Sequence, residues 1–523
     1  MKQVFFFVCA SLFACVGVAQ NGLGDEVDKL GKFLESIEER YVDSVETHAI
    51  VEAGIRGMLQ ELDPHSVYMD SETYTQSNES LKGRYNGIGV RYQMVDDTMT
   101  LLEILPGGAA YKAGLQTGDQ VILVQNDTVA GVELSSSEIT NLIKGSPEPL
   151  AVVQIRREST ILEPIEMEKS SVKVSSIPAY FMIDDQTGYI KHTRFSATSA
   201  GDFKEALDDL KKSKMKNLIL DLRGNGGGYL NVAQKMTDEF LEDRKLIVYT
   251  EGVHQARKEI FATSGGRFTD GELYVLIDEN SASASEILAG AIQDWDRGLI
   301  IGRRSFGKGL VQRTIEFKDG SAMRLTISRY YTPTGRSIQR PYDDQDLYRR
   351  EVKSRMQTGE LFEADSIKLN DELVYFTPGK RKVYGGGGIV PDVFVPEDTS
   401  HYNDQIQRIL KSGLHYGFAF HVRNEQKESK TLFESVSQLK EQYIISDEVL
   451  GSFEVYASKH GVVFDEGLTV EAKEFLRHNL RASLARIEFG YDAYFVIDSE
   501  TDSDVQKALT EIDLGTSKAI GLK

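Results

Sequence analysis

Strand-like and helix-like segments alternate between residues 171 and 342, and this alternation is the strongest constraint on the fold. Short apolar runs such as Asn217–Leu222 and Leu273–Ile277 are typical of buried strands. Between such runs, segments such as Ser199–Lys212 carry apolar residues at helical spacing. Strands that are separated by helices usually pair in parallel, because the helix returns the chain across the sheet. The pattern therefore predicts an α/β domain with a largely parallel sheet.

The segments on either side follow other patterns. Apolar residues recur at helical spacing from Asp25 until Asp63-Pro64 ends the run, which predicts a small helical region. Short alternating segments with a hairpin signal at Asp96-Asp97 predict a β-rich domain. The predicted organisation is a signal peptide at 1–19, a helical N-terminal region at 20–80, a β-rich domain at 81–170, an α/β core at 171–398 and a mainly helical C-terminal region at 399–523.

Size and charge narrow the class of protein. The chain has 523 residues, and single hydrophobic cores stop growing at about 250–300 residues, so several domains are expected. Its 80 acidic side chains against 60 Lys and Arg give a net charge of −20. A protein that binds nucleic acid over a broad surface needs an excess of positive charge to neutralise the phosphates. Nucleic acid is therefore not an expected partner.

The segment 1–19 has the features of a secretory signal. Its apolar stretch is too short to span a membrane comfortably, and small residues precede the expected cleavage after Ala19. We expect export to the periplasm and no membrane span. Lipid anchoring through Cys15 is the less favoured alternative, because a bulky Phe13 stands where a lipoprotein site has a small residue.

A glycine-rich turn follows the strand Asn217–Leu222. The run Asp221–Gly228 leads from that strand into a helix, where backbone N–H groups can be presented to a negative charge. A dinucleotide-binding fingerprint needs a further glycine where this chain has Tyr229. The remaining interpretations are a turn that receives an anion and a tight turn with no ligand.

A run of very small residues, Asn280–Glu286, lies at the next strand-to-helix step. A hydroxyl at this place would lie beside the N–H groups of a helix N-terminus, as in other nucleophile arrangements. The alternative is a serine N-cap with alanine packing. Spacing alone does not choose among Ser281, Ser283 and Ser285.

The segment Gly302–Gly309 nearly matches a phosphate-binding loop. Gly309 replaces the hydroxyl residue of that motif, and the strand-like Leu310–Phe317 follows where a helix is needed, so nucleotide binding is not expected. Packed among glycines and apolar strands, Lys308 would be desolvated, which lowers the pKa of its ammonium and makes a neutral amine available as a general base. An exposed lysine on a turn is the alternative.

Histidine is a poor candidate for the same role. None of the 9 histidines lies in these motifs, and the sequence has no H-E-x-x-H pattern. A Ser-His-Asp arrangement and a metallopeptidase are therefore not expected, and no metal or organic cofactor is implied.

Taken together, these motifs resemble those of the C-terminal processing (tail-specific) serine peptidase family. Asn280–Ala291 and Phe306–Gln312 are similar to the family's Ser and Lys motifs, and Asp221–Gly228 to its glycine turn. Leu62–Ser66 and Gly388–Asp392 match further family features in the same order. The resemblance covers about residues 25 to 395.

The resemblance implies a role for each residue of the site. Ser283 would be the nucleophile and Lys308 the base, while Gln312 would orient the lysine. The oxyanion hole would combine the Ala284 N–H with that of Gly227 or Gly228.

The β-rich domain resembles a PDZ module, which captures the free carboxylate of a peptide in a loop of backbone amides. The loop would be Gly87-Ile88-Gly89-Val90, and Ile139, Leu142 and Ile143 would form the pocket for an apolar last side chain. A domain that serves only as a spacer or lid is the alternative.

The expected function is an exported serine endopeptidase that recognises the C-terminal tails of unfolded or precursor proteins and cleaves them with a Ser-Lys dyad. Its expected partners are proteins or peptides with free C-termini, and the C-terminal region is a candidate surface for a homodimer or an adaptor. The alternative from another class is a catalytically inactive, PDZ-containing peptide-binding scaffold. That alternative predicts damaged dyad motifs, whereas both motifs are intact.

Overall fold

The computed structural model describes residues 4–145, 149–429, 433–464 and 467–522. Its chain divides into two compact units. The first contains Met1–Glu72 and Gln312–Thr326, and the second contains Thr73–Val311 and Ile327–Lys523.

The first unit contains the expected helical N-terminal region. Helices α1 (Val4–Arg40) and α2 (Thr47–Gln60) precede a short strand β1 (Val67–Met69), which pairs antiparallel with the first residues of β19 (Ala322–Tyr331). The Asp63 carboxylate accepts hydrogen bonds from the backbone N–H groups of the two residues after Pro64, at 2.9 and 3.0 Å. This turn explains why the helical run ends at the predicted place.

The predicted signal peptide lies partly outside the described residues, which begin at residue 4. The expected cleavage after Ala19 falls within the span of α1. In the part of the chain that was described, no helix is both long and apolar enough to cross a membrane.

The second unit begins at Thr73, within helix α3 (Ser71–Lys82), and a β-rich domain follows this helix. A tight turn at Asp96 and Asp97, with φ of 48° and 53°, joins its first two sheet strands, as the hairpin signal predicts. Helix α5 (Ser136–Gly145) packs its apolar side chains into the core of this sheet. The elements are β3 (Val90–Val95), β4 (Thr98–Ile104), α4 (Ala109–Lys112), β5 (Gln120–Val124), β6 (Asp127–Thr128), α5 (Ser136–Gly145), β7 (Leu150–Arg157), β8 (Thr160–Ile161) and β9 (Ile165–Glu168).

The α/β domain is built on one six-stranded sheet. The strands lie in the order β11 (Ala179–Met182), β12 (Thr187–Lys191), β13 (Asn217–Asp221), β16 (Glu272–Ile277), β17 (Leu299–Gly302) and β22 (Val393–Phe394). All neighbours pair in parallel except β11 with β12, which are antiparallel. The predicted parallel sheet is confirmed, with an antiparallel strand at one edge.

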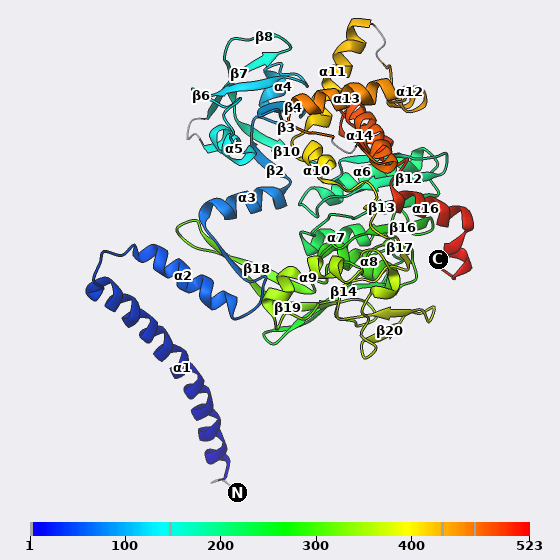
Figure 1. Ribbon diagram of the computed structural model, residues 1–523. Helices are drawn as coiled ribbons and strands as arrows, with labels where there is room; N and C mark the ends of the chain where they lie inside the picture. The colour runs from blue at the N-terminus through cyan, green and yellow to red at the C-terminus, as the bar shows by residue number, and fades with distance from the viewer. Residues whose placement is uncertain (1–3, 146–148, 430–432, 465–466, 523) are drawn as a thin grey trace. The chain divides into compact units, whose positions relative to one another are not determined.

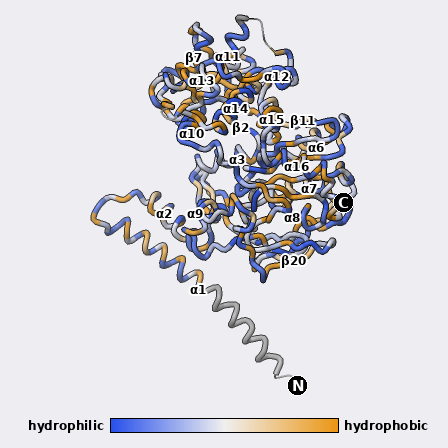
Figure 2. The backbone as a smooth tube through the Cα atoms, turned by 45° about the vertical axis from the view of Figure 1, so that its right-hand side comes forward, coloured by the Kyte–Doolittle hydropathy of each residue, from blue (hydrophilic) through white to orange (hydrophobic). Residues whose placement is uncertain are grey.

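Helices cover both faces of this sheet. One face packs against α6 (Ser199–Lys212), α7 (Leu230–Thr237) and α8 (Ala284–Asp294). In Figure 2, hydrophobic residues, coloured orange, are concentrated around α7 and α8. The other face packs against α16 (Ser503–Leu514), whose Val505 and Ala508 contact buried residues of the strands. Figure 1 shows α16 in red beside β13, β16 and β17. The sequence pattern does not predict that a segment so near the end of the chain completes this core.

The predicted helical C-terminal region is confirmed, and it packs on the β-rich domain. Helices α11 and α14 contact β3 and β4 through a cluster of apolar residues that includes Val95, Leu102 and Tyr416. The helices of this region are α10 (Asp404–Lys411), α11 (Leu414–Ser429), α12 (Val436–Gln442), α13 (Asp447–Lys459), α14 (Val470–Phe489), α15 (Tyr491–Asp498), α16 and α17 (Thr516–Ala519).

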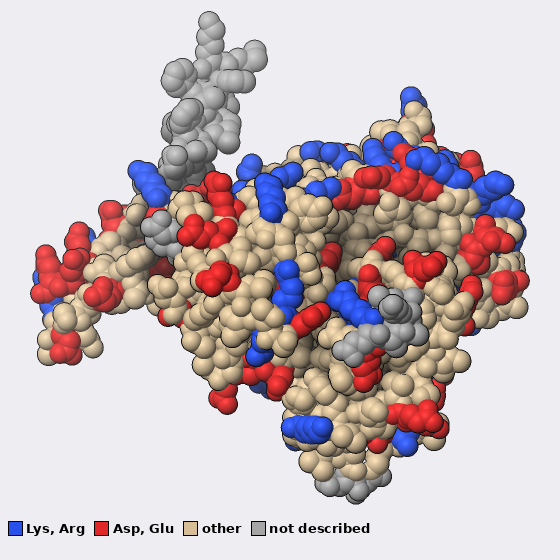
Figure 3. Space-filling view, turned by 90° about the horizontal axis from the view of Figure 1, so that it is seen from above, with Lys and Arg blue, Asp and Glu red and all other residues tan. Residues whose placement is uncertain are grey.

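On the face shown in Figure 3, Lys and Arg are interspersed with Asp and Glu instead of gathering into one basic surface.

Other strands form smaller sheets. Strand β14 (Leu246–Gly252) pairs antiparallel with β15 (Gln255–Phe261) and with residues 329–331 of β19. Strand β2 (Arg84–Gly87) pairs with β10 (Ser170–Lys173), and β20 (Val374–Phe376) pairs with β21 (Lys382–Tyr384). The remaining elements are β18 (Leu310–Glu316), α9 (Gln345–Gln357) and a short 3₁₀ helix (Ala364–Ser366).

Candidate active site

The glycine turn (Asp221–Gly228) and the serine loop (residues 279–286) lie at the carboxyl ends of neighbouring parallel strands. The turn follows β13 and the loop follows β16, so both open on the same edge of the sheet. The Ala282 N–H donates to the carbonyl oxygen of Asn225 at 3.0 Å, which joins the loop to the turn. The sequence therefore brings together two motifs that lie more than 50 residues apart in the chain.

The turn approaches the serine loop so closely that only glycine fits. A Cβ atom on Gly227 would lie 2.9 Å from the Cβ of Ser283 and 3.0 Å from the backbone nitrogen of Ala284. The φ of Gly227 is +97°, a conformation that other residues rarely adopt. On Gly228, a Cβ atom would lie 2.2 Å from the carbonyl oxygen of Phe195. The glycines therefore bring the backbone of the turn beside Ser283 and Ala284.

The three serines of the loop have different environments. Ser281 and Ser285 are completely buried, and their hydroxyls donate to the carbonyl oxygens of Leu222 and Asn225 at 2.9 and 2.8 Å. Ser283 is half-buried and precedes α8 with a φ of 55°. A non-glycine residue in this region stores backbone strain of about 1–3 kcal/mol, which is found mainly at functional sites. The structure thus distinguishes Ser283 from its neighbours, although spacing does not.

Glu286 links the serine loop to the lysine loop, which is the segment Gly302–Gly309. Its carboxylate is completely buried and accepts the backbone N–H of Ser283 at 2.7 Å and that of Lys308 at 2.9 Å. It also accepts the Ser305 hydroxyl at 2.6 Å and the Gly307 N–H at 2.7 Å. Burial raises the pKa of Glu286, and these hydrogen bonds oppose that shift. One carboxylate therefore ties together the backbones of Ser283 and Lys308.

Tyr330 makes a second connection between the same two residues. Its hydroxyl lies 3.1 Å from the carbonyl oxygen of Ser283 and also hydrogen-bonds the carbonyl oxygen of Lys308. The ring is buried, and burial raises the pKa of this phenol well above its ordinary value. Because the phenol keeps its proton, it remains a donor to these carbonyl groups.

Gln312 belongs to the first unit. It lies in β18, and its side-chain amide donates to the carbonyl oxygen of His65. Its predicted role beside the lysine stays a prediction.

The predicted carboxylate loop joins β2 to β3. Gly89 has a φ of +84°, and Ile88 is buried in the core of the β-rich domain. Burial raises the pKa of the Tyr85 phenol, and the backbone N–H groups of Val90 and Gly89 oppose that shift. The ring lies against Gly87, where a Cβ atom would come within 2.6 Å of a ring carbon. A side chain of the same domain therefore lies beside the amides predicted to receive a peptide carboxylate.

The predicted pocket residues lie on the core side of α5. Ile139 has no exposed surface, Ile143 is buried, and Leu142 is half-buried against the same core cluster. The other side of α5 lines a cavity of about 510 Å³ through Ser136, Thr140 and Lys144. The apolar face of the helix thus serves the core of the domain, and a polar face borders the cavity.

His192 lies behind the glycine turn. It is completely buried, with its Nδ1 atom 3.1 Å from Nδ2 of Asn225. Burial lowers the pKa of this imidazole to about 3.

Within the described ranges, no group of three or more His, Cys, Asp or Glu side chains is arranged to hold a metal ion.

Comparison with known proteins agrees with this arrangement. The carboxy-terminal-processing protease of Bartonella bacilliformis is 33% identical over 353 residues, which cover 65% of this chain and 80% of that protein. This chain belongs to the carboxy-terminal processing protease family. In the same family, the protease CtpA of Bacillus subtilis is 32% identical over 325 residues, which cover 62% of this chain and 69% of that protein.

The domains of this family member match separate family models. Residues 186–347 match peptidase family S41, residues 79–155 a PDZ domain, and residues 16–73 the N-terminal domain of the activating protease CtpB. Residues 405–490 match a family of unknown function, DUF8443. A solved structure of the photosystem II D1 C-terminal processing protease is 22% identical, covers 70% of this chain and 86% of its own, and has a TM-score of 0.38.

Sequence reasoning missed two of the residues that build the site in this protease. Glu286 is three residues after Ser283, and the S-x-x-E spacing of a helix capping box is the signal that could have identified it. Tyr330 is 47 residues from Ser283 and lies in a strand with no distinctive motif. Its contact with the site arises only from the tertiary fold.

Proposed function

We propose that this protease is an exported serine endopeptidase that captures the C-terminal tails of unfolded or precursor proteins through its PDZ domain and cleaves them with Ser283 and Lys308. The observation that carries the proposal is the conformation of Ser283, which precedes α8 with a positive φ and shares the Glu286 carboxylate with Lys308. A fixed relation between nucleophile and base is what a dyad requires.

In the proposed reaction, the Lys308 amine takes the proton of the Ser283 hydroxyl as the serine oxygen attacks the peptide carbonyl. The lysine then gives that proton to the leaving amine, and water releases the acyl group from the serine. Gln312 is proposed to orient the lysine amine through its side-chain oxygen.

The proposed oxyanion hole uses two backbone N–H groups. Ala284 is the first residue of α8, and N–H groups in the first turn of a helix have no partner within the helix. The Gly227 N–H already donates to the side-chain oxygen of Asn225 at 2.9 Å, so we assign the second donor to Gly228. Both groups belong to segments that pack against each other beside Ser283.

The proposed substrates are polypeptides with a free C-terminus. The PDZ match and the backbone amides of Gly87–Val90 support this class, because such loops receive a terminal carboxylate. The peptide would add as a strand beside α5, with its last side chain toward that helix.

The decisive test separates the three serines. An unfolded polypeptide with an apolar C-terminal residue is incubated with wild-type protein and with the Ser283→Ala, Ser281→Ala and Lys308→Ala variants, and the products are mapped by mass spectrometry. Ser283→Ala and Lys308→Ala should each lose several powers of ten in turnover while thermal unfolding stays cooperative. Substantial turnover by Ser283→Ala with none by Ser281→Ala would overturn the assignment.

Export is tested separately from catalysis. We propose cleavage after Ala19, so the N-terminus of protein isolated from cells should begin at Gln20. A lipid-modified N-terminus at Cys15 would support anchoring instead. Protein that retains Met1 in the cytoplasm would contradict both.

A further inference from the structure

The first turn of α16 lies against the loops of the candidate active site. Asp502 is the N-cap of this helix, and its side chain accepts the N–H groups of Asp504 and Val505 at 3.0 and 3.1 Å. Val505 is buried against the sheet beneath the site. The start of α16 is therefore fixed both by its cap and by its packing.

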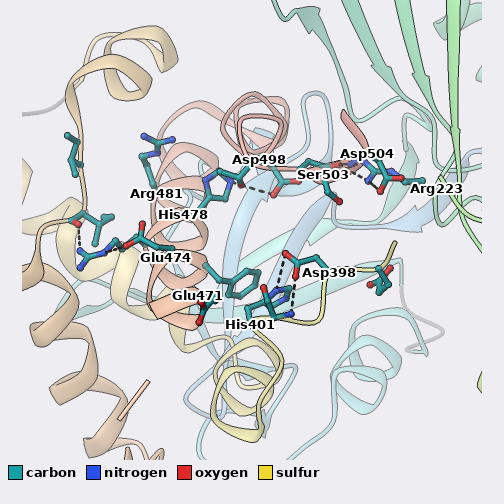
Figure 4. Close-up of a pocket in the computed structure, with 18 of the residues that line it drawn as sticks. Arg223, Asp398, His401, Glu471, Glu474, His478, Arg481, Asp498, Ser503 and Asp504 are labelled. Carbon is teal, nitrogen blue, oxygen red and sulfur yellow. Dashed lines mark hydrogen bonds and ion pairs between the residues drawn. The ribbon is translucent and has the colours of Figure 1, made fainter. Parts of the chain in front are cut away.

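Two carboxylates of this turn bind Arg223 of the glycine turn. The Arg223 guanidinium donates to Asp502 at 2.9 and 2.8 Å and to Asp504 at 2.9 Å. It also donates to Asp221 at 2.7 Å, directly at the end of β13. Figure 4 shows Arg223 and Asp504 side by side, at one end of a cavity of about 650 Å³. Carboxylates at the end of β13 and at the start of α16 therefore both hold the Arg223 side chain.

Asp504 also reaches the other two loops of the site. Its carboxylate lies 3.7 Å from Arg303, which donates to Glu279 of the serine loop at 2.9 Å. A Cβ atom on Gly302 would lie 3.1 Å from Asp504, so this side chain packs directly on the start of the segment that carries Lys308. Asp504 therefore contacts the glycine turn and the lysine loop directly, and it is linked to the serine loop through Arg303.

Stability alone gives no reason for a buried ionised carboxylate at this point. Burial raises the pKa of Asp504 to about 6, although Arg223 and Arg303 oppose that shift. Holding Asp504 ionised at neutral pH therefore costs stability, and Asp502 already supplies the helix cap. A buried charge that is retained at a cost is expected where it orients its partner.

We propose that Asp502 and Asp504 are positioning residues for peptide-bond cleavage, which act through Arg223 and Arg303 to hold the three loops that carry the dyad and the oxyanion hole. This inference rests on the proposed function of Ser283 and Lys308. It assigns to the end of the chain, beyond the region that matches the peptidase family, a part in the reaction.

The test uses Asp502→Asn and Asp504→Asn. Asparagine also caps helices well, so Asp502→Asn removes the charge and keeps the cap. We expect kcat for a short peptide substrate to fall about 10- to 100-fold in each variant, with KM within about twofold of the wild-type value. Lys518→Ala is the matched control, because it removes an ion pair of 2.6 Å between the C-terminal segment and Glu272, at the other end of the sheet. The control should keep wild-type kcat.

A double variant separates positioning from general destabilisation. If Asp502 acts through Arg223, then adding Asp502→Asn to Arg223→Gln should reduce kcat less than about threefold further. Multiplied losses, or unchanged kcat in Asp502→Asn, would overturn the proposal. Because the Asp502 side chain is 15% exposed, this variant gives an answer even where Asp504→Asn does not fold.

An acylation experiment distinguishes failure of the positioning role from failure of the proposed function. The protein is treated with an activated acyl ester, and mass spectrometry locates the acyl group on the protein. Acylation of wild-type protein at Ser283, with slower acylation in both Asn variants, supports the positioning role. Acylation at equal rates overturns only the positioning role. Acylation of the wild-type protein at a residue other than Ser283 contradicts the proposed function, and with it the positioning role.

Discussion

The carboxylate of Glu286 accepts the backbone N–H groups of both Ser283 and Lys308, at 2.7 and 2.9 Å. The serine loop and the lysine loop follow different strands, so nothing in the local chain geometry fixes their separation. A single buried carboxylate with four donors does so at low entropic cost, because Glu286 is itself held in the first turn of α8. One prediction concerns the Glu286 carboxylate, and another concerns the Tyr330 hydroxyl, which connects the same two residues.

Glu286→Gln should reduce kcat by about 100-fold and lower the free energy of unfolding by about 1–3 kcal/mol. The amide of glutamine offers one acceptor oxygen in place of two, so buried N–H groups lose their partner. The measurements are steady-state kinetics with a short peptide and thermal unfolding. Glu272→Gln, at the start of β16, is the control and should keep activity. Wild-type kcat in Glu286→Gln would show that the link has no role in the reaction.

Tyr330→Phe should reduce kcat by about 3- to 30-fold with little change in KM. Phenylalanine keeps the packing of the ring but removes the donor to the carbonyl oxygens of Ser283 and Lys308, which frees both loops to shift slightly. Tyr331→Phe is the control at the adjacent residue, because the Tyr331 ring stacks on that of Tyr249, with 4.8 Å between the ring centroids. If both tyrosine variants behave alike, the hydroxyl of Tyr330 is not what holds the site.

The sequence was sufficient for the fold class because strand–helix alternation is a strong, local signal. It could not assign α16 to the sheet, since an amphipathic helix does not reveal which apolar surface it covers. The same limit explains α5: the positions Ile139 and Ile143 form its apolar face, and apolar residues at that spacing are what the core of the domain itself requires. Domain boundaries and the roles of the site residues stay predictions.

Within the candidate site, the proposed dyad lies in short motifs, whereas the residues that support it do not. Ser283 and Lys308 lie in runs of small residues, and the family resemblance of these runs is what led to the prediction of their roles. Tyr330 and Asp504 contact these loops from distant parts of the chain, and neither lies in a pattern that differs from ordinary strand or helix sequence. Their contribution depends on tertiary packing, which periodicity does not encode.

Acid should destabilise the second unit through His192. The folded state holds the pKa of this imidazole at about 3, below the ordinary value of 6.5, so the unfolded chain binds a proton first as pH falls. The stability that depends on this group is therefore fully present above about pH 6.5 and is lost toward pH 3, by roughly 1.4 kcal/mol per pH unit between the two pKa values. Thermal unfolding between pH 8 and 4 measures the slope. His192→Gln should flatten it, whereas the exposed His254→Gln should leave it unchanged.

Lys308→Arg tests the proposed base. Arginine keeps the positive charge but cannot lose its proton at ordinary pH, so this variant should be inactive even though it folds. Activity of the wild-type enzyme should rise with pH as the lysine amine becomes neutral. An active Lys308→Arg protein would exclude the base role. If a histidine variant instead abolishes activity and its dependence on pH, that histidine would be the candidate base.

The last prediction concerns tail capture by the PDZ domain. The backbone N–H groups of Gly89 and Val90 oppose the burial shift in the pKa of the Tyr85 hydroxyl, so a substrate carboxylate would compete with this phenol for the same donors. Tyr85→Phe removes this competitor and keeps the ring, and the affinity for a free-acid tail should rise about 3- to 10-fold. Calorimetry with the Ser283→Ala protein measures it without cleavage. Tyr92→Phe, on the neighbouring strand, is the comparison variant, because its hydroxyl contacts Thr140 of α5 at 2.6 Å and not the loop.

Amidation of the tail tests whether its terminal charge is recognised. An amidated C-terminus lacks the charge that the loop amides receive, and should bind about 10- to 150-fold more weakly than the free acid, the range expected for one charged hydrogen bond of about 1.5–3 kcal/mol. The gain from Tyr85→Phe should appear for the free acid and be absent for the amide, since only the carboxylate competes with the phenol for the same donors. Equal affinity for acid and amide in both proteins would show that the loop does not read the C-terminus. A weaker free-acid affinity in Tyr85→Phe would instead make the phenol a contact of the bound tail.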